Sequence, residues 1–312
     1  MKHLDLATGH GYDVIGDIHG YADALRRLLI KLGYIEVEGA FRHESRKAIF
    51  VGDFVDRGPE QREVLRIARA MCEAETAFAL LGNHEFNAIA WATPDGMGGF
   101  LRSHTEPNRK QHGAFLGQLG EGSPDYQDAI RWFGDLPVWL ELPGLRVVHA
   151  CWHEPSRVAL GPYLDGQGRF TEEGIGEALR RGSAAYDAAA ILMKGPEQRL
   201  PPAMYFSDKD GHERREVRIK WWNPDATTFR RAALGVDDRL GELPDLNLPV
   251  DFIYRDSTPV LFGHYAINGE PRLTSSTAAC VDFGVTKEGY LTAYRWSGES
   301  ELLPEHLVHV PA

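Results

Sequence analysis

The side chains most able to do chemistry in this sequence follow short apolar segments and are flanked by glycine or another small residue. They form five clusters, which are Gly16-Asp17-Ile18-His19-Gly20, Gly52-Asp53-Phe54-Val55-Asp56-Arg57-Gly58, Gly82-Asn83-His84-Glu85, His149-Ala150 and Gly263-His264. Carboxylate and amide oxygens mixed with imidazole nitrogens favour manganese, iron or zinc over calcium. A single Gly-Asp turn or a single histidine is usually structural. Five such clusters, each directly after an apolar segment, predict a metal site.

The elements that must position these clusters are predicted to be alternating strands and helices. A β-prone run at 12–15 and apolar runs at 48–51 and 77–81 each end at one of the clusters, and helical patterns with apolar residues three and four positions apart follow the first two. Further strands are expected at 145–148, 259–262, 279–281 and 290–294. This alternation predicts βαβ units around a buried sheet, and ligands gather at the carboxyl ends of such strands.

Two long segments interrupt this pattern. Residues from about 95 to 130 and from about 152 to 250 are richer in glycine, proline and charge. We interpret them as insertions that form a cap or substrate-facing loops of a single domain over residues 1–312. A basic stretch at 213–220 is expected to be a solvated face.

Length and composition limit the class of protein. The 312 residues are 43% hydrophobic and 25% charged, which suits one large α/β domain and excludes fibrous and disordered classes. The formal net charge of −11 argues against broad nucleic-acid binding. No apolar run approaches the ~18 residues of a membrane span, the first residues do not resemble a signal peptide, and three cysteines are too few for a disulfide framework. We therefore expect no membrane contact and a cytoplasmic location.

Together the five clusters resemble the signature series of the calcineurin-like metallophosphoesterases. The Asp-Arg-Gly of the second cluster resembles, more narrowly, the phosphoprotein phosphatase superfamily. The ending Val281-Asp282-Phe283-Gly284 and the strand after it are similar to bacterial members, which include protein phosphatases and symmetrical diadenosine tetraphosphate hydrolases. The resemblance implies an α/β fold, a four-layer α/β/β/α sandwich of two mixed sheets that carries the cap insertions.

The resemblance also implies a site for two divalent cations, of which Mn²⁺ is the first expectation and iron, zinc or nickel are alternatives. The implied ligands are Asp17 and His19 for one metal, Asp53 as a bridge between both, and Asn83, His149 and His264 for the other. Two cations about 3.5–4 Å apart share a hydroxide, which attacks phosphorus in line.

Three further residues have implied roles in the reaction. His84 would protonate the leaving oxygen, and Asp56 would hold the other nitrogen of its ring. Arg57 would clamp two phosphoryl oxygens. The alternative is that Asp56 and Arg57 merely pair across a turn.

The sequence departs from the family pattern in two places. Where relatives often have His-Gly-Gly, this chain has His149-Ala150-Cys151-Trp152-His153. We predict that His153 contacts the substrate, while Cys151 is either near the site or a buried packing residue. Relatives supply a second phosphate-binding arginine before the last histidine. Arg218, Arg230 and Arg231 are candidates, and Arg230 is favoured because it follows Trp222-Asn223-Pro224.

These residues predict a dimetal-dependent phosphoesterase that hydrolyses phosphomonoesters, including those of phosphoproteins. The alternative is symmetrical hydrolysis of diadenosine tetraphosphate, which needs an aromatic slot and several basic residues along the polyphosphate. A third hypothesis is a catalytically silent, metal-dependent binding module, and the complete ligand set counts against it. The expected partner is a phosphorylated small molecule, nucleotide or phosphoprotein.

Overall fold

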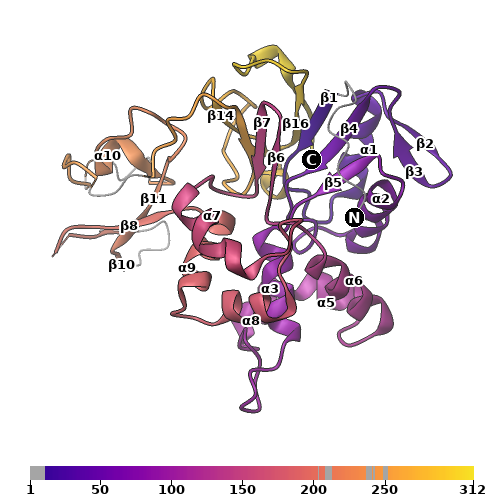
Figure 1. The fold of residues 1–312 in the computed structure, drawn as a ribbon, viewed down its shortest axis with the longest axis horizontal. Coiled ribbons are helices and arrows are strands. Elements are labelled where there is room, and N and C mark those ends of the chain that lie inside the picture. The colour runs from indigo at the N-terminus through magenta and orange to yellow at the C-terminus, as the bar shows by residue number, and fades with distance from the viewer. Residues whose placement is uncertain (1–10, 203, 208–212, 237–240, 242, 249–251) are drawn as a thin grey trace.

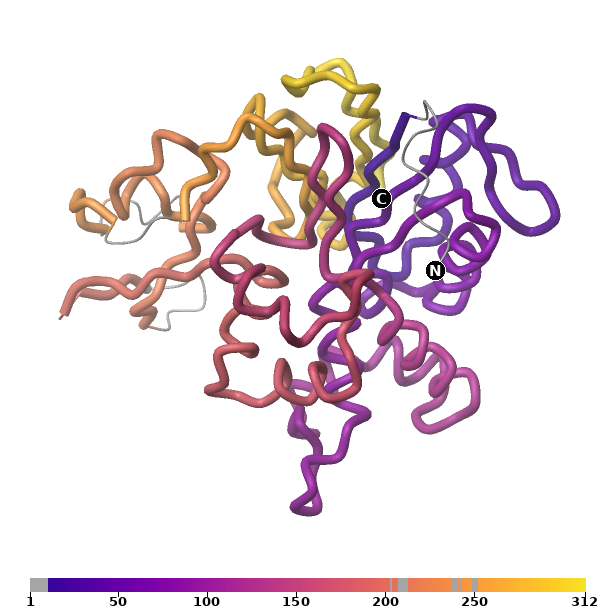
Figure 2. Tube along the Cα trace, in the orientation of Figure 1, coloured from indigo at the N-terminus to yellow at the C-terminus, as the bar shows by residue number. Residues whose placement is uncertain are grey.

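A six-stranded mixed sheet carries the first three clusters (Figure 1). The computed structural model describes residues 11–202, 204–207, 213–236, 241, 243–248 and 252–312. The strand order is β15 (Asp282–Phe283), β16 (Tyr290–Trp296), β1 (Gly11–Ile15), β4 (Arg46–Phe50) and β5 (Ala77–Ala79), with β17 (Leu307–Pro311) also on β16. Strands β1, β4 and β5 are parallel, and β16 is antiparallel to β1. Figure 2 shows this pairing of the two ends of the chain.

A second mixed sheet carries the last two clusters. Its order is β14 (Ala278–Cys280), β13 (Val260–Phe262), β7 (Leu145–Val148) and β6 (Trp139–Leu142). Strand β13 is parallel to both of its neighbours, and β6 is antiparallel to β7. The predicted strands at 145–148, 259–262 and 279–281 are therefore confirmed, whereas the sequence reading missed β6 and β17.

The two sheets pack face to face through buried aliphatic side chains. Val14 and Ile49 of the first sheet share a core with Val147 and Leu261 of the second. Alternate residues of the same strands point the other way, so that Ile15 and Phe50 pack beneath the helices α1 (Ala22–Lys31) and α2 (Gln61–Glu73). The mixed α/β architecture predicted from the sequence is confirmed.

The outer face of the second sheet packs against a cluster of aromatic side chains. Phe262 packs against Trp221 and Trp222, with ring centroids 4.6 and 5.0 Å away. The Trp221 indole donates hydrogen bonds to the Ala150 carbonyl and the Tyr265 hydroxyl, both at 3.0 Å. These contacts fix the segment around Trp221 to the strand that leads into the fifth cluster.

The two insertions are largely helical. The first contains α4 (Glu106–Gln111) and α5 (Gly113–Leu119) and runs into α6 (Pro124–Gly134). The second contains α7 (Glu154–Leu160), η1 (Gly161–Tyr163), α8 (Glu172–Leu179), α9 (Ala184–Lys194) and α10 (Phe229–Ala232). It also holds the short strands β8 (Glu197–Arg199), β9 (Phe206–Ser207), β10 (Glu213–Arg214), β11 (Glu216–Ile219) and β12 (Ala233–Leu234). Parts of the segment 152–250 lie outside the described residues.

Helices α5 to α9 gather below the sheets in Figure 1, together with α3 (Asn83–Ala92). The remaining elements are the hairpin β2 (Ile35–Val37) and β3 (Ala40–Arg42) and the short turns η3 (Val285–Lys287) and η4 (Pro304–His306). Within the described ranges, every helix is too short or too polar to cross a bilayer.

The carboxyl ends of strands from both sheets meet at one place. The backbone N–H of Gly263, after β13, donates to the carbonyl of His149, after β7, at 2.8 Å. The backbone N–H of His264 donates to the carboxylate of Asp17, after β1, at 3.1 Å. The five clusters are thereby brought to a common edge.

Candidate metal centre and active site

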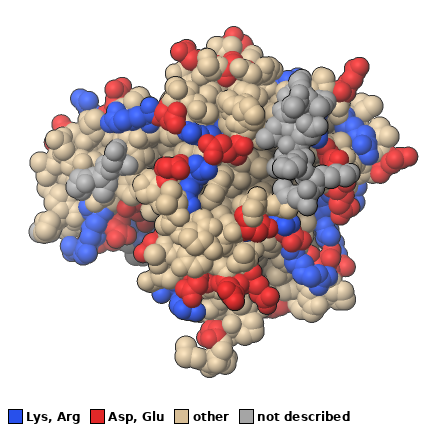
Figure 3. Space-filling view, viewed as in Figure 1, with Lys and Arg blue, Asp and Glu red and all other residues tan. Residues whose placement is uncertain are grey.

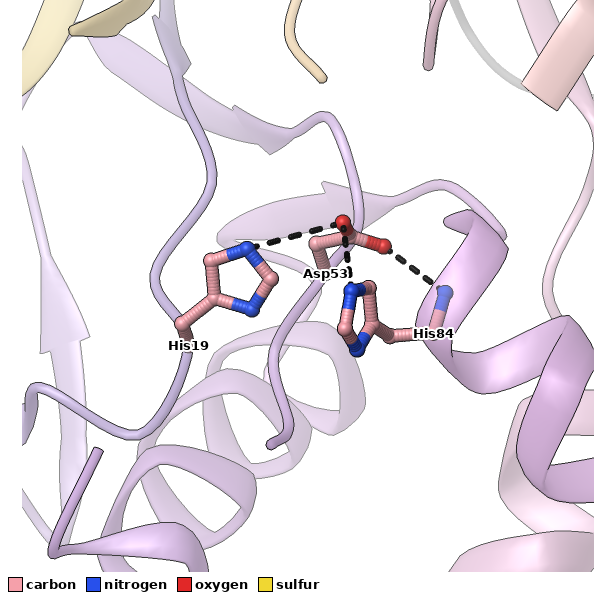
Figure 4. Close-up of side chains that lie close together, drawn as sticks. All are labelled: His19, Asp53 and His84. Atoms are coloured by element: carbon pink, nitrogen blue, oxygen red, sulfur yellow. Dashed lines mark hydrogen bonds and ion pairs between the residues drawn. The ribbon is translucent and has the colours of Figure 1, made fainter. Parts of the chain in front are cut away.

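One oxygen of Asp53 faces the rings of both His19 and His84 (Figure 4). Nε2 of His19 lies 3.6 Å from Oδ2 of Asp53 and 4.0 Å from Oδ2 of Asp17. Nδ1 of His19 lies 2.9 Å from the carbonyl oxygen of Val55, so this nitrogen carries the proton in the neutral ring. The lone pair of Nε2 is therefore directed at the carboxylates.

A second group of candidate ligands surrounds the other oxygen of Asp53. Nε2 of His149 lies 3.5 Å from Oδ1 of Asp53 and 3.1 Å from Oδ1 of Asn83, and Nδ1 of His264 lies 2.7 Å from the same amide oxygen. Nδ1 of His149 donates to the carbonyl of Val51 at 2.8 Å. The two oxygens of Asp53 thus face two separate sets of ligands, which is the geometry a bridging carboxylate requires.

The donor set fits divalent cations. Asp17 and Asp53 are 3% and 2% exposed and lie near the buried Asp282, without a lysine or arginine pairing to them among the described residues. Burial raises the pKa of Asp17 well above its usual range, and Asp282 and then Asp53 add to that rise. The bare nitrogen of His149 also faces the acceptor oxygen of Asn83. Cations held between these atoms would relieve the repulsion among the buried carboxylates. They would also relieve the repulsion between the lone pairs of His149 and Asn83.

Unusual backbone conformations place these ligands. His19, Asp53, Asp56 and His264 have φ angles of 48°, 53°, 70° and 75°, in the left-handed region that side-chain-bearing residues rarely adopt. Such conformations persist at functional sites when the surrounding structure enforces them. A Cβ atom at Gly263 would lie 2.1 Å from Oδ1 of Asp17, so only glycine allows this approach.

Glu85 holds the second and third clusters together. Its carboxylate accepts hydrogen bonds from the backbone N–H groups of Gly82, Asp53, Phe54 and Val55 at 2.8–3.3 Å. Burial, and then the charge of Asp53, raise its pKa to about 8. Glu85 stands at the third position of α3, where a glutamate closes a capping box. The sequence analysis assigns no role to Glu85, although its position three residues after Gly82 is typical of a capping box.

His84 belongs to a buried His–Asp–His arrangement. Nδ1 of His84 lies 2.6 Å from Oδ2 of Asp56, and Nδ1 of His112 lies 2.7 Å from Oδ1 of the same carboxylate. Burial raises the pKa of Asp56, but hydrogen bonds from His112 and then His84 outweigh it, so the pKa falls to about 2. Burial lowers the pKa of His84, whereas Asp53 and then Asp56 raise it, with a net rise. The sequence reading missed His112, which lies in the insertion without a local motif.

Arg57 lies at the open side of the centre. Its side chain is exposed, and Nη1 is 3.4 Å from the hydroxyl of Thr286. Burial, then His84, and then Arg57 lower the pKa of His19, which falls to about 3 despite Asp53. The guanidinium is therefore near the candidate ligands. No Asp56–Arg57 ion pair occurs in the described structure, because the carboxylate of Asp56 is engaged by two histidines.

The structure does not bring two of the predicted substrate contacts to the metal centre. Nε and Nη2 of Arg230 donate to the carbonyl of Leu243 at 3.2 and 2.8 Å, within a separate apolar cluster. Nδ1 of His153 lies 2.8 Å from the hydroxyl of Ser156, and its ring packs on Phe252. Cys151 is buried against aromatic residues, and burial raises the pKa of its thiol well above the usual range. It is a packing residue here.

A cavity of about 620 Å³ opens beside the centre. Asn83 and His264 line it together with Arg102, Lys194 and Arg218. Of the three arginines that are candidates for phosphate binding, Arg218 lines this cavity and Arg230 does not. Elsewhere the surface mixes acidic and basic side chains, as the face in Figure 3 shows.

Comparison with known proteins agrees with this geometry. The family model described as calcineurin-like phosphoesterase matches residues 12–177. Bis(5'-nucleosyl)-tetraphosphatase PrpE of Halalkalibacterium halodurans, designated asymmetrical, is 45% identical over 74 residues, which are 23% of this chain and 30% of that protein. The corresponding protein of Oceanobacillus iheyensis is 40% identical over 73 residues, or 23% and 29% of the two chains. The matches therefore span less than a third of the length of these relatives.

Solved structures of low sequence identity share the fold. A protein provisionally assigned as a diadenosine tetraphosphatase superposes with a TM-score of 0.51 at 18% identity, covering 97% of this chain and 94% of the other. A protein serine/threonine phosphatase of Saccharomyces cerevisiae, similar to human phosphatase PP5, gives a TM-score of 0.50 at 14% identity, covering 98% and 81%. At these identities the likeness extends to the fold alone.

Proposed function

Because the chain belongs to the calcineurin-like phosphoesterase family, we propose that it hydrolyses phosphoester bonds with two divalent metal ions. The observation that carries this proposal is the placement of Asp53, whose two oxygens face His19 on one side and His149 on the other. Mn²⁺ is the metal we propose first, with iron, zinc or nickel as alternatives that the same mixed oxygen and nitrogen ligands accept. A cytoplasmic location is part of the proposal.

The residues divide between the two cations. Asp17, His19 and Asp53 would hold one, and Asp53, Asn83, His149 and His264 would hold the other. When bound, the two cations would supply Lewis-acid stabilisation of the phosphoryl group and a water molecule of lowered pKa. The protein provides fixed positions for these ligands, since Val51 and Val55 accept the Nδ1 protons of His149 and His19.

The remaining groups act on the substrate. His84 donates the proton on Nε2 to the leaving oxygen, and Asp56 keeps the ring in position by accepting the proton on Nδ1. The charges of Asp53 and then Asp56 raise the pKa of His84, which favours the protonated ring that can donate. Arg57, exposed beside these groups, binds two phosphoryl oxygens through its planar guanidinium.

The test compares an aryl phosphate with an alkyl phosphate in the presence of manganese. We expect Asp53→Asn to lose about 100-fold or more of the activity on both esters, because the bridging carboxylate charge is removed. His84→Asn should lower hydrolysis of the alkyl ester about 10²–10⁴-fold and the aryl ester less, because a good leaving group needs no proton. His309→Asn, on β17, is the matched control. Unchanged rates in both variants, or an inactive, fully metal-loaded wild type, would contradict the proposal.

A second candidate is hydrolysis of a nucleoside polyphosphate. It is favoured by the cationic side chains in the cavity beside the candidate ligands. The relatives above are named tetraphosphatases of the asymmetrical type, whereas the sequence reading named the symmetrical reaction. A parallel screen of phosphopeptides, nucleoside polyphosphates and monoesters separates these activities. With diadenosine tetraphosphate, two ADP molecules mark symmetrical cleavage, and ATP with AMP marks asymmetrical cleavage.

A further inference from the structure

The cavity beside the candidate metal centre is cationic, although the whole chain has a formal net charge of −11. Four basic side chains line it against two acidic ones, and these residues are Arg102, Arg181, Lys194, Arg218, Asp187 and Glu197. Asn83 and His264 line the same space, so the cavity is continuous with the candidate metal ligands. An anion bound at the metals would therefore lie next to these four basic side chains, which we call the cationic wall.

The basic side chains are incompletely satisfied by the protein. Glu197 is paired with Arg218, at 3.4 Å between Oε1 and Nε. Nη2 of Arg102 donates to Oε1 of Gln111 at 2.6 Å, but its Nη1 is buried and lacks a hydrogen-bond partner in the described structure. A buried donor left in this way is destabilising unless a ligand or water accepts from it.

Lys194 and Arg181 add charge without an internal counter-ion. Lys194 is the last residue of α9 and is half-buried, and among the described residues neither cation makes a hydrogen bond or ion pair. Burial lowers the pKa of Lys194, and Arg102 and then Arg181 lower it further, with partial compensation by Glu197. These three cations are close enough to repel one another. Such a cluster is stabilised by a ligand with several negative charges.

We propose that Arg102, Arg181 and Lys194 bind the phosphate groups that adjoin the scissile one, so that the substrate carries a polyphosphate chain. This inference rests on the proposed function, because the metal centre fixes where the scissile phosphate lies. A phosphomonoester presents one phosphate to the metals and leaves the cationic wall unpaired. In a polyphosphate, attack by water forms one P–O bond and breaks the bridging P–O bond, whose electron pair leaves on the departing phosphate.

The direct test measures binding rather than turnover. Calorimetric titrations compare inorganic tripolyphosphate with orthophosphate, using full-length protein and the same manganese concentration in cell and syringe. We expect wild type to prefer tripolyphosphate, and Lys194→Gln and Arg181→Gln each to weaken tripolyphosphate binding at least fivefold more than orthophosphate binding. Arg102→Gln should act in the same direction, but this residue also contacts Gln111. The exposed Arg181 keeps the test valid if Arg102→Gln fails to fold.

Matched controls lie close by. Arg180 is the neighbour of Arg181 but pairs with Glu177 at 2.8 Å, and Lys110 is an exposed lysine of the first insertion. Neither residue lines the cavity. Arg180→Gln and Lys110→Gln change the net charge by the same amount and should leave the preference for tripolyphosphate intact. Equal losses for both anions, or losses as large in these controls, would overturn the inference.

A kinetic arm distinguishes this inference from the proposed function. The ratio of kcat/KM for a nucleoside polyphosphate to that for an aryl monophosphate should fall at least tenfold in Lys194→Gln. If the wild type binds tripolyphosphate through these residues but hydrolyses no phosphoester, the proposed function is wrong and the anion site is supported. A wild type that hydrolyses monoesters, with a ratio unchanged in the variants, refutes the anion site and keeps the phosphoesterase.

Discussion

Nδ1 of His112 lies 2.7 Å from one carboxylate oxygen of Asp56, whose other oxygen lies 2.6 Å from Nδ1 of His84. Two imidazoles from different segments therefore hold a single carboxylate. His112 is fully buried between Trp91 and Phe115. Because both oxygens of Asp56 are engaged, the carboxylate cannot rotate, and the ring of His84 is held with Nε2 toward the metal centre.

The first prediction concerns His112 as a positioning residue. His112→Ala should lower kcat for an alkyl phosphate about tenfold with little change in KM, because Asp56 loses one of its two donors and orients His84 less well. His112→Asn, which keeps an N–H donor near Nδ1, should restore part of the activity. Steady-state kinetics on alkyl and aryl phosphates check this. If kcat falls and KM rises together in His112→Ala, and His112→Asn restores no activity, His112 only supports the fold.

The second prediction concerns metal removal and pH. In the metal-free protein, burial raises the pKa of Asp17 well above its usual value and that of Glu85 to about 8. Above about pH 4 the folded state therefore keeps protons on these carboxyl groups that the unfolded state releases. Because of this difference, the free energy of unfolding of the metal-free protein falls as pH rises toward 8. Metal binding needs deprotonated carboxylates and is stronger at higher pH.

Thermal unfolding with and without manganese measures this effect. The stabilisation by metal should be larger at pH 8 than at pH 5.5, and about 2.7 kcal/mol when the metal is at 100 times its Kd. Asp53→Asn should respond much less to manganese at either pH. A stabilisation that is equal at both pH values would contradict the assignment of these buried carboxylates to the metal site.

The third prediction uses the close approach of Gly263 to Asp17. A methyl group at position 263 would lie 2.1 Å from the Asp17 carboxylate and 2.7 Å from Val51. Gly263→Ala should displace the ligand and weaken manganese binding about 10–100-fold, as seen when groups that support metal ligands are changed. Gly161→Ala, where a Cβ atom meets nothing within 4 Å, is the control. Equal metal affinity in the two variants would mean that the turn at Gly263 does not set the position of Asp17.

The fourth prediction separates charge from shape at Arg57. Arg57→Ala should mainly raise KM for monoesters, and Arg57→Lys should restore little, because an ammonium group cannot make two parallel hydrogen bonds to a phosphoryl group. Among the described residues, the Arg57 side chain makes one hydrogen bond, to the Thr286 hydroxyl at 3.4 Å, so folding should be unaffected. Wild-type KM and kcat in Arg57→Ala would remove this residue from the substrate site.

The fold class and the meeting of the first three clusters could be predicted because they depend on local sequence. Each of the first three clusters follows a strand that is largely buried at its carboxyl end, and the glycine beside each candidate ligand is needed for a close approach or a turn. Parallel strands with their carboxyl ends at one edge then bring Asp17, Asp53 and Asn83 together without knowledge of distant contacts.

The site residues that the insertions supply could not be predicted from local sequence. His112 meets a partner 56 positions earlier in the chain, and Lys194 reaches its cavity because α9 ends there. No spacing rule links such residues to the strands. Arg230 shows the reverse case, since its place after Trp222-Asn223-Pro224 suggested phosphate binding, whereas its guanidinium is engaged by a nearby carbonyl.

The first insertion supplies both His112, which contacts Asp56, and Arg102, which lines the cationic cavity. The same stretch of chain therefore reaches both the partner of His84, which is the proposed proton donor, and the proposed polyphosphate site. Exchanging this segment for one without a histidine at position 112 would also remove a partner of Asp56. Replacing this insertion should therefore change the cavity wall and the position of His84 together, and activity should return only when a histidine is restored at position 112.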